Sequence, residues 1–393
     1  MSFAKQLNIL DYALQGLWRR RLKTGGIVVI FSAVIFLAAS FQFTIKALNN
    51  LVDQDLRATP EIVIQKMTAG RQESIPLDYI RKLKGIWGIR RVVPRIWGYY
   101  FDATTKANYT VIGLDYSKMP MGDLLDKALI RGGHLPGPGE ALVGTGVKGV
   151  LRLPDKGAML SLFRPDYTLK ALKVVGEFVP STDILTTDTI LMNLADSRDL
   201  FGIKPGLVTD LCVYVANPRE VTTIARKIAA RLPDTRVVPR SQIKETYREV
   251  FGWRGGFASI CLLTAIAAFI IFAWDKASGM NPDEKREVAI LKVIGWQTAD
   301  ILGLRFYEGF IVSFVSFLLG CTLAYAHVAF MGAGLFRPIL TGWSVIHPRM
   351  MLRPALEFSD ILLIFALVVP PYMAATIVPA WRSAIIPPDA AVN

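Results

Sequence analysis

The sequence contains few of the side chains from which catalytic and metal sites are usually built. Its 393 residues include three cysteines and three histidines, and His134, His327 and His347 lie far apart. Cys261 and Cys321 fall within apolar segments, and the cysteine spacing indicates no disulfide framework. We therefore predict no metal site, and the sequence offers no nucleophile–base constellation from which to argue a catalytic residue.

A nucleotide-binding motif is missing as well. P-loop ATPases hold phosphates with the pattern Gly-x-x-x-x-Gly-Lys-Ser/Thr, and this pattern does not occur in the sequence. The segment 144–149 has only a superficial similarity to it. We therefore expect that the chain is not an enzyme and that it binds no cofactor itself.

Acidic residues are outnumbered by basic ones, with 32 Asp and Glu against 45 Lys and Arg, for a net charge of +13. Hydrophobic residues make up 52% of the chain and the mean hydropathy is +0.38. This composition is too apolar for an ordinary soluble protein, and it indicates a few spans with one sizeable soluble domain. In such a protein the basic excess more often marks topology than nucleic-acid binding, and no nucleic-acid module accompanies it.

Apolar segments of membrane-spanning length occur at residues 25–47, 255–275, 301–330 and 361–380. Within the first, Gly25–Phe43 would form a helix roughly 29 Å long, and we expect an uncleaved anchor. Paired prolines, Pro370 and Pro371, should kink the last. Basic residues flank the segments on one side, which the positive-inside rule places in the cytoplasm. We therefore predict a multi-pass protein of the cytoplasmic (inner) membrane with both termini cytoplasmic.

The remaining segments are a cytoplasmic amphipathic helix (1–24), an extracytoplasmic domain (48–254), a cytoplasmic loop (276–300), an outer loop (331–360) and a cytoplasmic tail (381–393). In the first of these, one helical face is apolar, with Phe3, Leu7, Leu10, Leu14 and Leu17. The insertion 48–254 alternates predicted strands and helices, including a strand at Asp210–Val215 and a helix capped by Asn217. Pro94 should break the strand predicted at Arg90–Asp102. The fold class is thus a four-helix membrane protein with an α+β domain inserted between helices 1 and 2.

Residues 281–300 predict a short helix with both ends marked. Asn281 is a suitable N-cap, Glu284 completes a capping box, and Gly295 supplies a left-handed end. An apolar stripe runs along the helix at Val288, Leu291 and Ile294. In the following span, a stripe of small residues predicts close helix packing, within or between protomers; its members are Gly309, Ser313, Ser316 and Gly320.

Four stretches of the chain resemble the FtsX-like ABC transporter permeases, the group that contains MacB and the lipoprotein-releasing permeases. The strongest is Glu-Lys-Arg-Glu-Val-Ala-Ile-Leu-Lys-Val-Ile-Gly-Trp at 284–296, and the others lie at 13–24, 132–144 and 378–390. The resemblance implies that the 284–296 helix couples to a separate ABC ATPase, which binds the ATP and Mg. The residues implied in coupling are Glu284, Arg286, Glu287, Val288, Leu291, Ile294 and Gly295.

The same resemblance implies a second permease subunit, in a homodimer or a heterodimer, contact with membrane lipid, and an extracytoplasmic partner or cargo. Export, lipoprotein handling and efflux are all within the family's range. Two other functions stay open: a regulatory transmitter that controls an extracytoplasmic enzyme, and a membrane-anchored receptor without an ATPase. For the helix itself, the alternative is a charged amphipathic helix in the headgroup plane.

Overall fold

The computed structural model describes residues 3–56, 59–116, 130–131, 134–154, 157–179, 182–251, 282–338, 345–346, 352, 354 and 356–385. The chain divides into two compact units, which we describe separately. The first comprises Met1–Leu48, Phe251–Phe336 and Leu352–Asn393, and the second comprises Asn49–Val250 and Arg337–Met351. The second unit covers most of the segment in which we expected a soluble domain.

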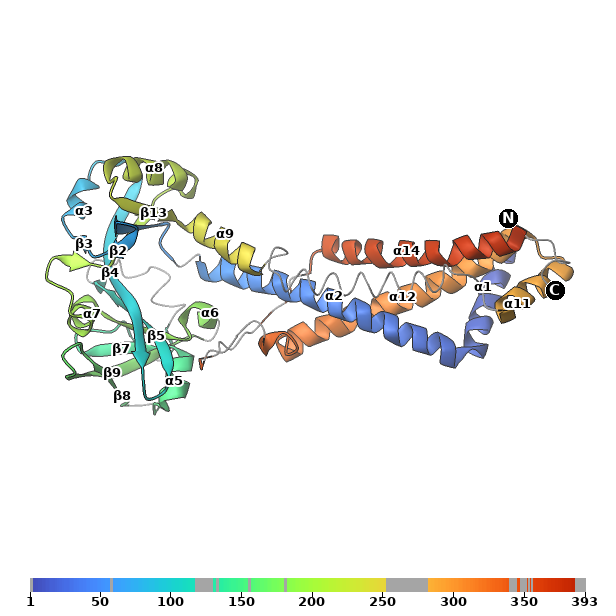
Figure 1. Cartoon of the computed structure of the whole chain (residues 1–393), viewed down its shortest axis with the longest axis horizontal. Coiled ribbons are helices and arrows are strands. Elements are labelled where there is room, and N and C mark those ends of the chain that lie inside the picture. The colour runs from blue at the N-terminus through green and yellow to red at the C-terminus, as the bar shows by residue number, and fades with distance from the viewer. Residues whose placement is uncertain are drawn as a thin grey trace. The chain divides into compact units, whose positions relative to one another are not determined.

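The first unit is built from helices, and its long helices α2, α12 and α14 run beside one another (Figure 1). Its elements are α1 (Phe3–Arg19), α2 (Arg21–Leu56), α11 (Pro282–Val293), α12 (Thr298–Met331) and α14 (Phe358–Ile385). Three of these helices are long and apolar enough to cross a membrane, over Arg21–Asp53, Thr298–Met331 and Phe358–Trp381. The span predicted at 255–275 lies outside the described residues, so the count of four stays a prediction.

Aromatic side chains join the long helices of the first unit. Phe31 of α2 stacks on Tyr372 of α14 with ring centroids 4.9 Å apart, and Phe317 of α12 meets Phe365 of α14 edge-on at 5.6 Å. The helix α14 continues through Pro370, so the paired prolines do not interrupt it. Neighbouring helices can compensate for a missing backbone donor in a spanning helix.

The second unit is an α+β domain around an eleven-stranded mixed sheet. Its strands are β1 (Ile62–Thr68), β2 (Arg71–Glu73), β4 (Ile89–Asp102), β5 (Ala107–Leu114), β6 (Ile130–Arg131), β7 (Glu140–Val143), β8 (Met159–Phe163), β9 (Leu169–Phe178), β10 (Thr189–Asn193), β12 (Asp210–Val215) and β13 (Thr235–Pro239). Two short strands, β3 (Ile75–Pro76) and β11 (Leu207–Val208), pair separately.

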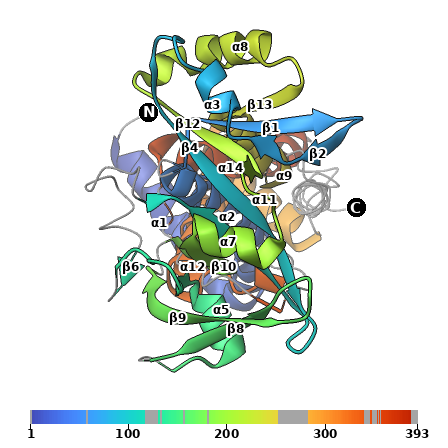
Figure 2. The ribbon, with the colours of Figure 1, turned by 90° about the vertical axis from the view of Figure 1, so that its left-hand side faces the viewer.

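The helices of this unit are α3 (Tyr79–Lys82), α5 (Thr145–Leu151), α6 (Asp183–Thr186), α7 (Leu194–Phe201), the 3₁₀ turn η3 (Pro218–Glu220), α8 (Val221–Arg231) and α9 (Arg240–Phe251). Helix α7 lies against the central strands (Figure 2). Gly98 of β4 permits this approach, because a Cβ there would lie 3.0 Å from the ring of Phe201.

The two ends of the inserted segment meet at the sheet edge. Strand β1 lies between β12 and β13, with Ile64 opposite Leu211 on one side and Val237 on the other. The Arg240 N–H also donates to the Glu61 carbonyl oxygen at 2.8 Å. The domain therefore closes with strands from both flanks of the insertion.

The sequence predicted most of these elements, with two corrections. Strand β12 has the predicted limits, Asp210–Val215. Pro94, however, does not break β4, because the pairing with β5 begins only at Arg95 and Pro94 has a strand, β12, on one side alone. Asn217 caps η3 by accepting the Arg219 N–H, and α8 follows as a separate helix.

Candidate coupling site

The helix α11 ends where the sequence predicted. Gly295 has a φ of +100°, which favours glycine. The Gly295 N–H donates to the Lys292 carbonyl oxygen, and the Trp296 N–H donates to that of Leu291, both at 3.0 Å. This pair of bonds is a Schellman motif. Asn281 and the side chain of Glu284 lie outside the described residues, so the predicted capping box is not observed.

The predicted apolar stripe of α11 does not form one outward face. Leu291 is 5% exposed and packs in a cluster with Ile9 and Ala13 of α1 and Leu304 of α12. Val288 is also buried, against Ile301 of α12. These two side chains attach the helix to its own chain.

The outward face of α11 uses other residues. Ile290, Val293 and Ile294 are 52%, 79% and 69% exposed. Of these, only Ile294 belongs to the apolar stripe expected from the sequence, because the spacing of the apolar residues indicates a single face. The structure thus separates α11 into an inner face that packs on α1 and α12 and an outer apolar face.

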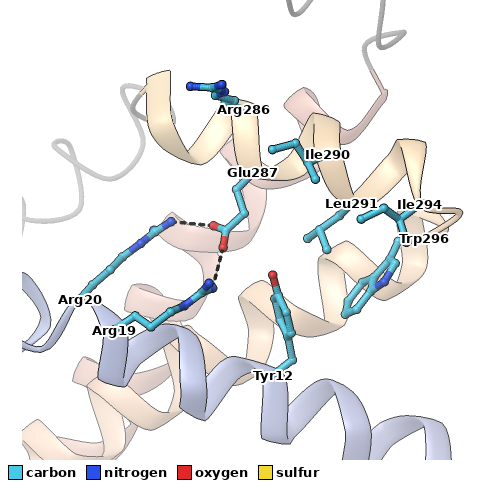
Figure 3. Close-up of a pocket in the computed structure, with 9 residues that line it drawn as sticks. All are labelled: Tyr12, Arg19, Arg20, Arg286, Glu287, Ile290, Leu291, Ile294 and Trp296. Atoms are coloured by element: carbon cyan, nitrogen blue, oxygen red, sulfur yellow. Dashed lines mark hydrogen bonds and ion pairs between the residues drawn. The ribbon is translucent and has the colours of Figure 1, made fainter.

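A pocket of about 780 Å³ lies beside α11 (Figure 3). It is lined by Tyr12, Arg19, Arg20, Arg286, Glu287, Ile290, Leu291, Ile294 and Trp296. The rings of Tyr12 and Trp296 lie 5.4 Å apart. With three arginines and one glutamate in its lining, the pocket combines positive charge with apolar and aromatic surface.

Glu287 points inward from α11 and binds arginines of two other elements. Its Oε2 lies 2.7 Å from Nη2 of Arg20 and 3.6 Å from Nη2 of Arg305, and its Oε1 lies 3.5 Å from Nη2 of Arg19. Arg305 also pairs with Glu308, one helical turn along α12, at 2.6 Å. Glu287 was predicted as an ATPase contact, but only 18% of its side chain is exposed.

Helix α1 also has two distinct faces. A narrow face of Ile9, Ala13 and Gly16 is buried. The apolar face predicted from the sequence is different and is left open, since Phe3 is 79% exposed and Leu14 is 48% exposed. An exposed apolar face next to a spanning helix is the pattern of a helix that lies on a membrane surface.

The four small residues of α12 are all buried. A Cβ on Gly309 would lie 2.7 Å from Oγ1 of Thr376 on α14, and a Cβ on Gly320 would lie 2.7 Å from the Cβ of Ile35 on α2. The glycines of this stripe therefore contact helices of the same chain.

Among the described residues, no group of three His, Cys, Asp or Glu side chains could hold a metal ion.

Parts of the chain are similar to known membrane proteins. Residues 256–388 match the model of the FtsX-like permease C-terminal family. The lipoprotein-releasing system transmembrane protein LolC of Haemophilus influenzae is 23% identical over 203 residues, which cover 51% of this chain. The chain matches about half (48%) of that relative's length.

Two solved structures of extracytoplasmic regions are also similar in part. The extracellular domain of the noncanonical ABC-type transporter YknZ from Gram-positive bacteria gives a TM-score of 0.32 at 13% identity, covering 45% of this chain and 98% of that one. The periplasmic region of MacB from Actinobacillus actinomycetemcomitans gives 0.34 at 9% identity, covering 50% and 96%. The family match and the LolC similarity agree with each other: residues 256–388 of this chain resemble the FtsX-like permeases, the family of ABC transporter permeases to which the chain is similar.

Proposed function

We propose that this chain is the membrane subunit of an ABC complex and that a separate ATPase docks on the outer face of α11. The observation that carries the proposal is the division of α11 into two faces. Its inner face is fixed by Val288 and Leu291, whereas Ile290, Val293 and Ile294 are exposed on a short helix with a defined end. Exposed apolar side chains gathered on one helix favour a protein partner.

The charge around α11 indicates which kind of partner surface fits. Arg19 has 63% of its side chain exposed, and Arg286 is exposed at the rim of the same pocket. An apolar patch with basic residues beside it is complementary to an apolar groove with acidic residues beside it. We therefore expect the ATPase to present carboxylates next to the site that receives Ile290 and Ile294.

The headgroup alternative fits less well, because the exposed apolar face of α1 is a different face from the one that lines the pocket. On α1, Phe3, Leu7 and Leu14 are exposed, and Tyr12 and Arg19 line the pocket. At 100° per residue these two sets lie on nearly opposite sides of the helix. If Phe3 and Leu14 rest on the membrane, the pocket opens away from it.

We propose that the complex acts on an extracytoplasmic cargo through its inserted domain. The relative LolC belongs, by its name, to a lipoprotein-releasing system, so a lipid-modified protein is the first class of cargo to test. A regulatory transmitter built on the same permease differs only in what the domain contacts. Identification of the proteins bound to the native complex separates these two functions.

The docking proposal is tested with the purified chain and the ABC ATPase that co-purifies with it from its native membrane. The double variant Ile290→Asp/Ile294→Asp should lose most ATPase binding, because each change places a charge where apolar surface is buried. Leu169→Asp is the matched control, since Leu169 is 57% exposed on β9, in the other unit. If the double variant binds the ATPase as tightly as the control does, α11 is not the docking element.

A further inference from the structure

Glu287 joins three elements that are far apart in the sequence. It lies on α11, whereas Arg19 ends α1, Arg20 follows it directly, and Arg305 lies near the start of α12 (Figure 3 shows the α1 side). We propose that Glu287 is a positioning residue that makes the starts of α2 and α12 move with α11 when the ATPase moves that helix. This inference rests on the proposed function.

Arg20 gives Glu287 a direct connection to the first span. Helix α1 ends at Arg19 and α2 begins at Arg21, so Arg20 is the junction between them. Its guanidinium makes the shortest contact with Glu287, at 2.7 Å, and 36% of its side chain is exposed. A displacement of Glu287 is therefore applied at the first turn of α2.

Arg305 gives a second connection, to α12. Its side chain is 10% exposed and lies between two carboxylates, Glu287 at 3.6 Å and Glu308 at 2.6 Å. Gly16 of α1 packs beside the same group, because a Cβ there would lie 3.4 Å from Oε1 of Glu308. A buried cation held in this way resists movement, because leaving its partners would expose an uncompensated charge.

Glu287 offsets part of the positive charge of the arginines that surround it. Arg19, Arg20 and Arg305 carry three positive charges, and Glu287 and Glu308 carry two negative ones. Removal of the Glu287 charge takes away the carboxylate that these contacts place between Arg20, directly after α1, and Arg305 of α12, so the attraction between the two elements is weakened.

The apolar inner face of α11 cannot replace this function. Val288 and Leu291 hold the helix by non-directional contacts, and such contacts tolerate sliding. The contact of Glu287 with Arg20 depends on direction and distance. The apolar contacts therefore keep α11 attached, and Glu287 sets where along α1 and α12 it is attached.

The inference is tested by following the distance between α11 and α2 through the nucleotide cycle. Spin labels are placed at Val29, which is 68% exposed on α2, and at Lys292 on α11, after replacement of the native cysteines. In the parent complex, this distance should stay the same with and without ATP, because both helices move together. In Glu287→Gln, it should change with ATP, and in Glu287→Asp it should again stay nearly constant.

The control and the contrary outcomes separate the inference from the docking proposal. Glu357→Gln removes a carboxylate that is paired with Lys46 and 70% exposed, and it should leave the α11–α2 distance behaviour as in the parent. An unchanged distance in Glu287→Gln overturns the inference. Loss of ATPase binding in Glu287→Gln, as severe as in Ile290→Asp/Ile294→Asp, also overturns it, because Glu287 would then contact the partner. If the parent chain binds no ATPase, the proposed function itself fails.

Discussion

Gly320 of α12 lies against Ile35 of α2 so closely that a Cβ on the glycine would come within 2.7 Å of the Ile35 Cβ and 3.0 Å of the Ser32 carbonyl oxygen. The first contact is with a β-branched side chain and the second is with backbone, so neither neighbour can move aside easily. Position 320 is therefore a place where α2 and α12 approach through their backbones, as small residues allow in membrane helices.

Gly320→Ala should destabilise the protein by about 1–3 kcal/mol, the usual cost of added volume in a packed interior. Thermal unfolding in detergent should show a lower midpoint. Gly303→Ala on the same helix is the control, because a Cβ there would lie 4.0 Å from Cγ2 of Ile9, an ordinary contact. Equal midpoints for the two variants would show that the helices accommodate a methyl group at position 320.

Replacement by alanine should destabilise the protein at Ser40 of α2 but not at Ser32 of the same helix. Ser40 Oγ lies 2.5 Å from Nδ1 of His327, and Nε2 of that ring accepts the Leu335 N–H at 3.1 Å. The neutral ring therefore carries its proton on Nδ1 and donates it to Ser40. Ser40→Ala leaves that buried donor without its acceptor, which costs about 1–3 kcal/mol.

Ser32 is buried as well, but its Oγ has no hydrogen-bond partner among the residues that the structure describes. Ser32→Ala should therefore be neutral or slightly stabilising. The two variants are compared by thermal unfolding of the full chain in the same detergent. A loss in Ser32→Ala that matches the loss in Ser40→Ala would contradict the assigned hydrogen bond.

The β7 region of the α+β domain should lose stability in acid. A hydrogen bond from the Gly137 N–H, assisted by His134, holds the pKa of Glu140 below its ordinary value. A carboxylate whose pKa is lowered by folding stabilises the protein above its unfolded pKa, about 4.3 for Glu, and this contribution disappears as the pH falls through the folded pKa.

Glu140→Gln should therefore increase hydrogen exchange in β7 at pH 7, and its difference from the parent should shrink below about pH 4. Glu245→Gln, at an exposed position on α9, is the control and should leave β7 unchanged. The exchange is measured by mass spectrometry on the full chain. A difference from the parent that is the same at both pH values would show that Glu140 stabilises β7 without its charge.

Membrane topology is predicted from the basic residues and can be measured directly. Single cysteines at Lys5 of α1 and Lys292 of α11 should react only after the cytoplasmic side becomes accessible. A cysteine at Arg226, which is exposed on α8, should react from the outside. Labelling of the Lys292 position from outside would reverse the orientation and exclude an ATPase at α11.

Local signals in the sequence predicted individual elements well. The end of α11 at Gly295 and the strand Asp210–Val215 depend on a few neighbouring residues, and both are present. The packing of each element depends on chain segments that are distant in the sequence. Val288 and Leu291 have the spacing of an apolar face, but nothing in residues 281–300 reveals that α1 and α12 cover that face.

Contacts with distant segments also explain why the sequence did not reveal that Glu287 is an inward-pointing residue. Beside Arg286 in a charged helix it had the pattern of a surface residue, and its partner Arg20 is 267 residues away. Arg305 and Glu308 lie one helical turn apart, a spacing at which opposite charges on a helix pair. Their connection to Glu287 could be found only from the structure. The expected break at Pro94 was wrong for a related reason. Only the pairing with β5 shows that β4 has a single neighbouring strand at Pro94.

The hydrogen bond between Glu61 and Arg240 brings together the two ends of the main segment of the α+β domain. Because β1 pairs with β13 and the chain enters and leaves the domain at adjacent residues, a segment cut at these two points leaves ends that a few residues could join. Because Ile346, from residues 337–351 of the same unit, packs in the core of this domain, an exchange between permeases has to include residues 337–351 as well. Chimaeras between permeases that exchange residues 59–240 together with 337–351 should therefore fold, and their bound proteins would show whether this domain selects the partner or cargo.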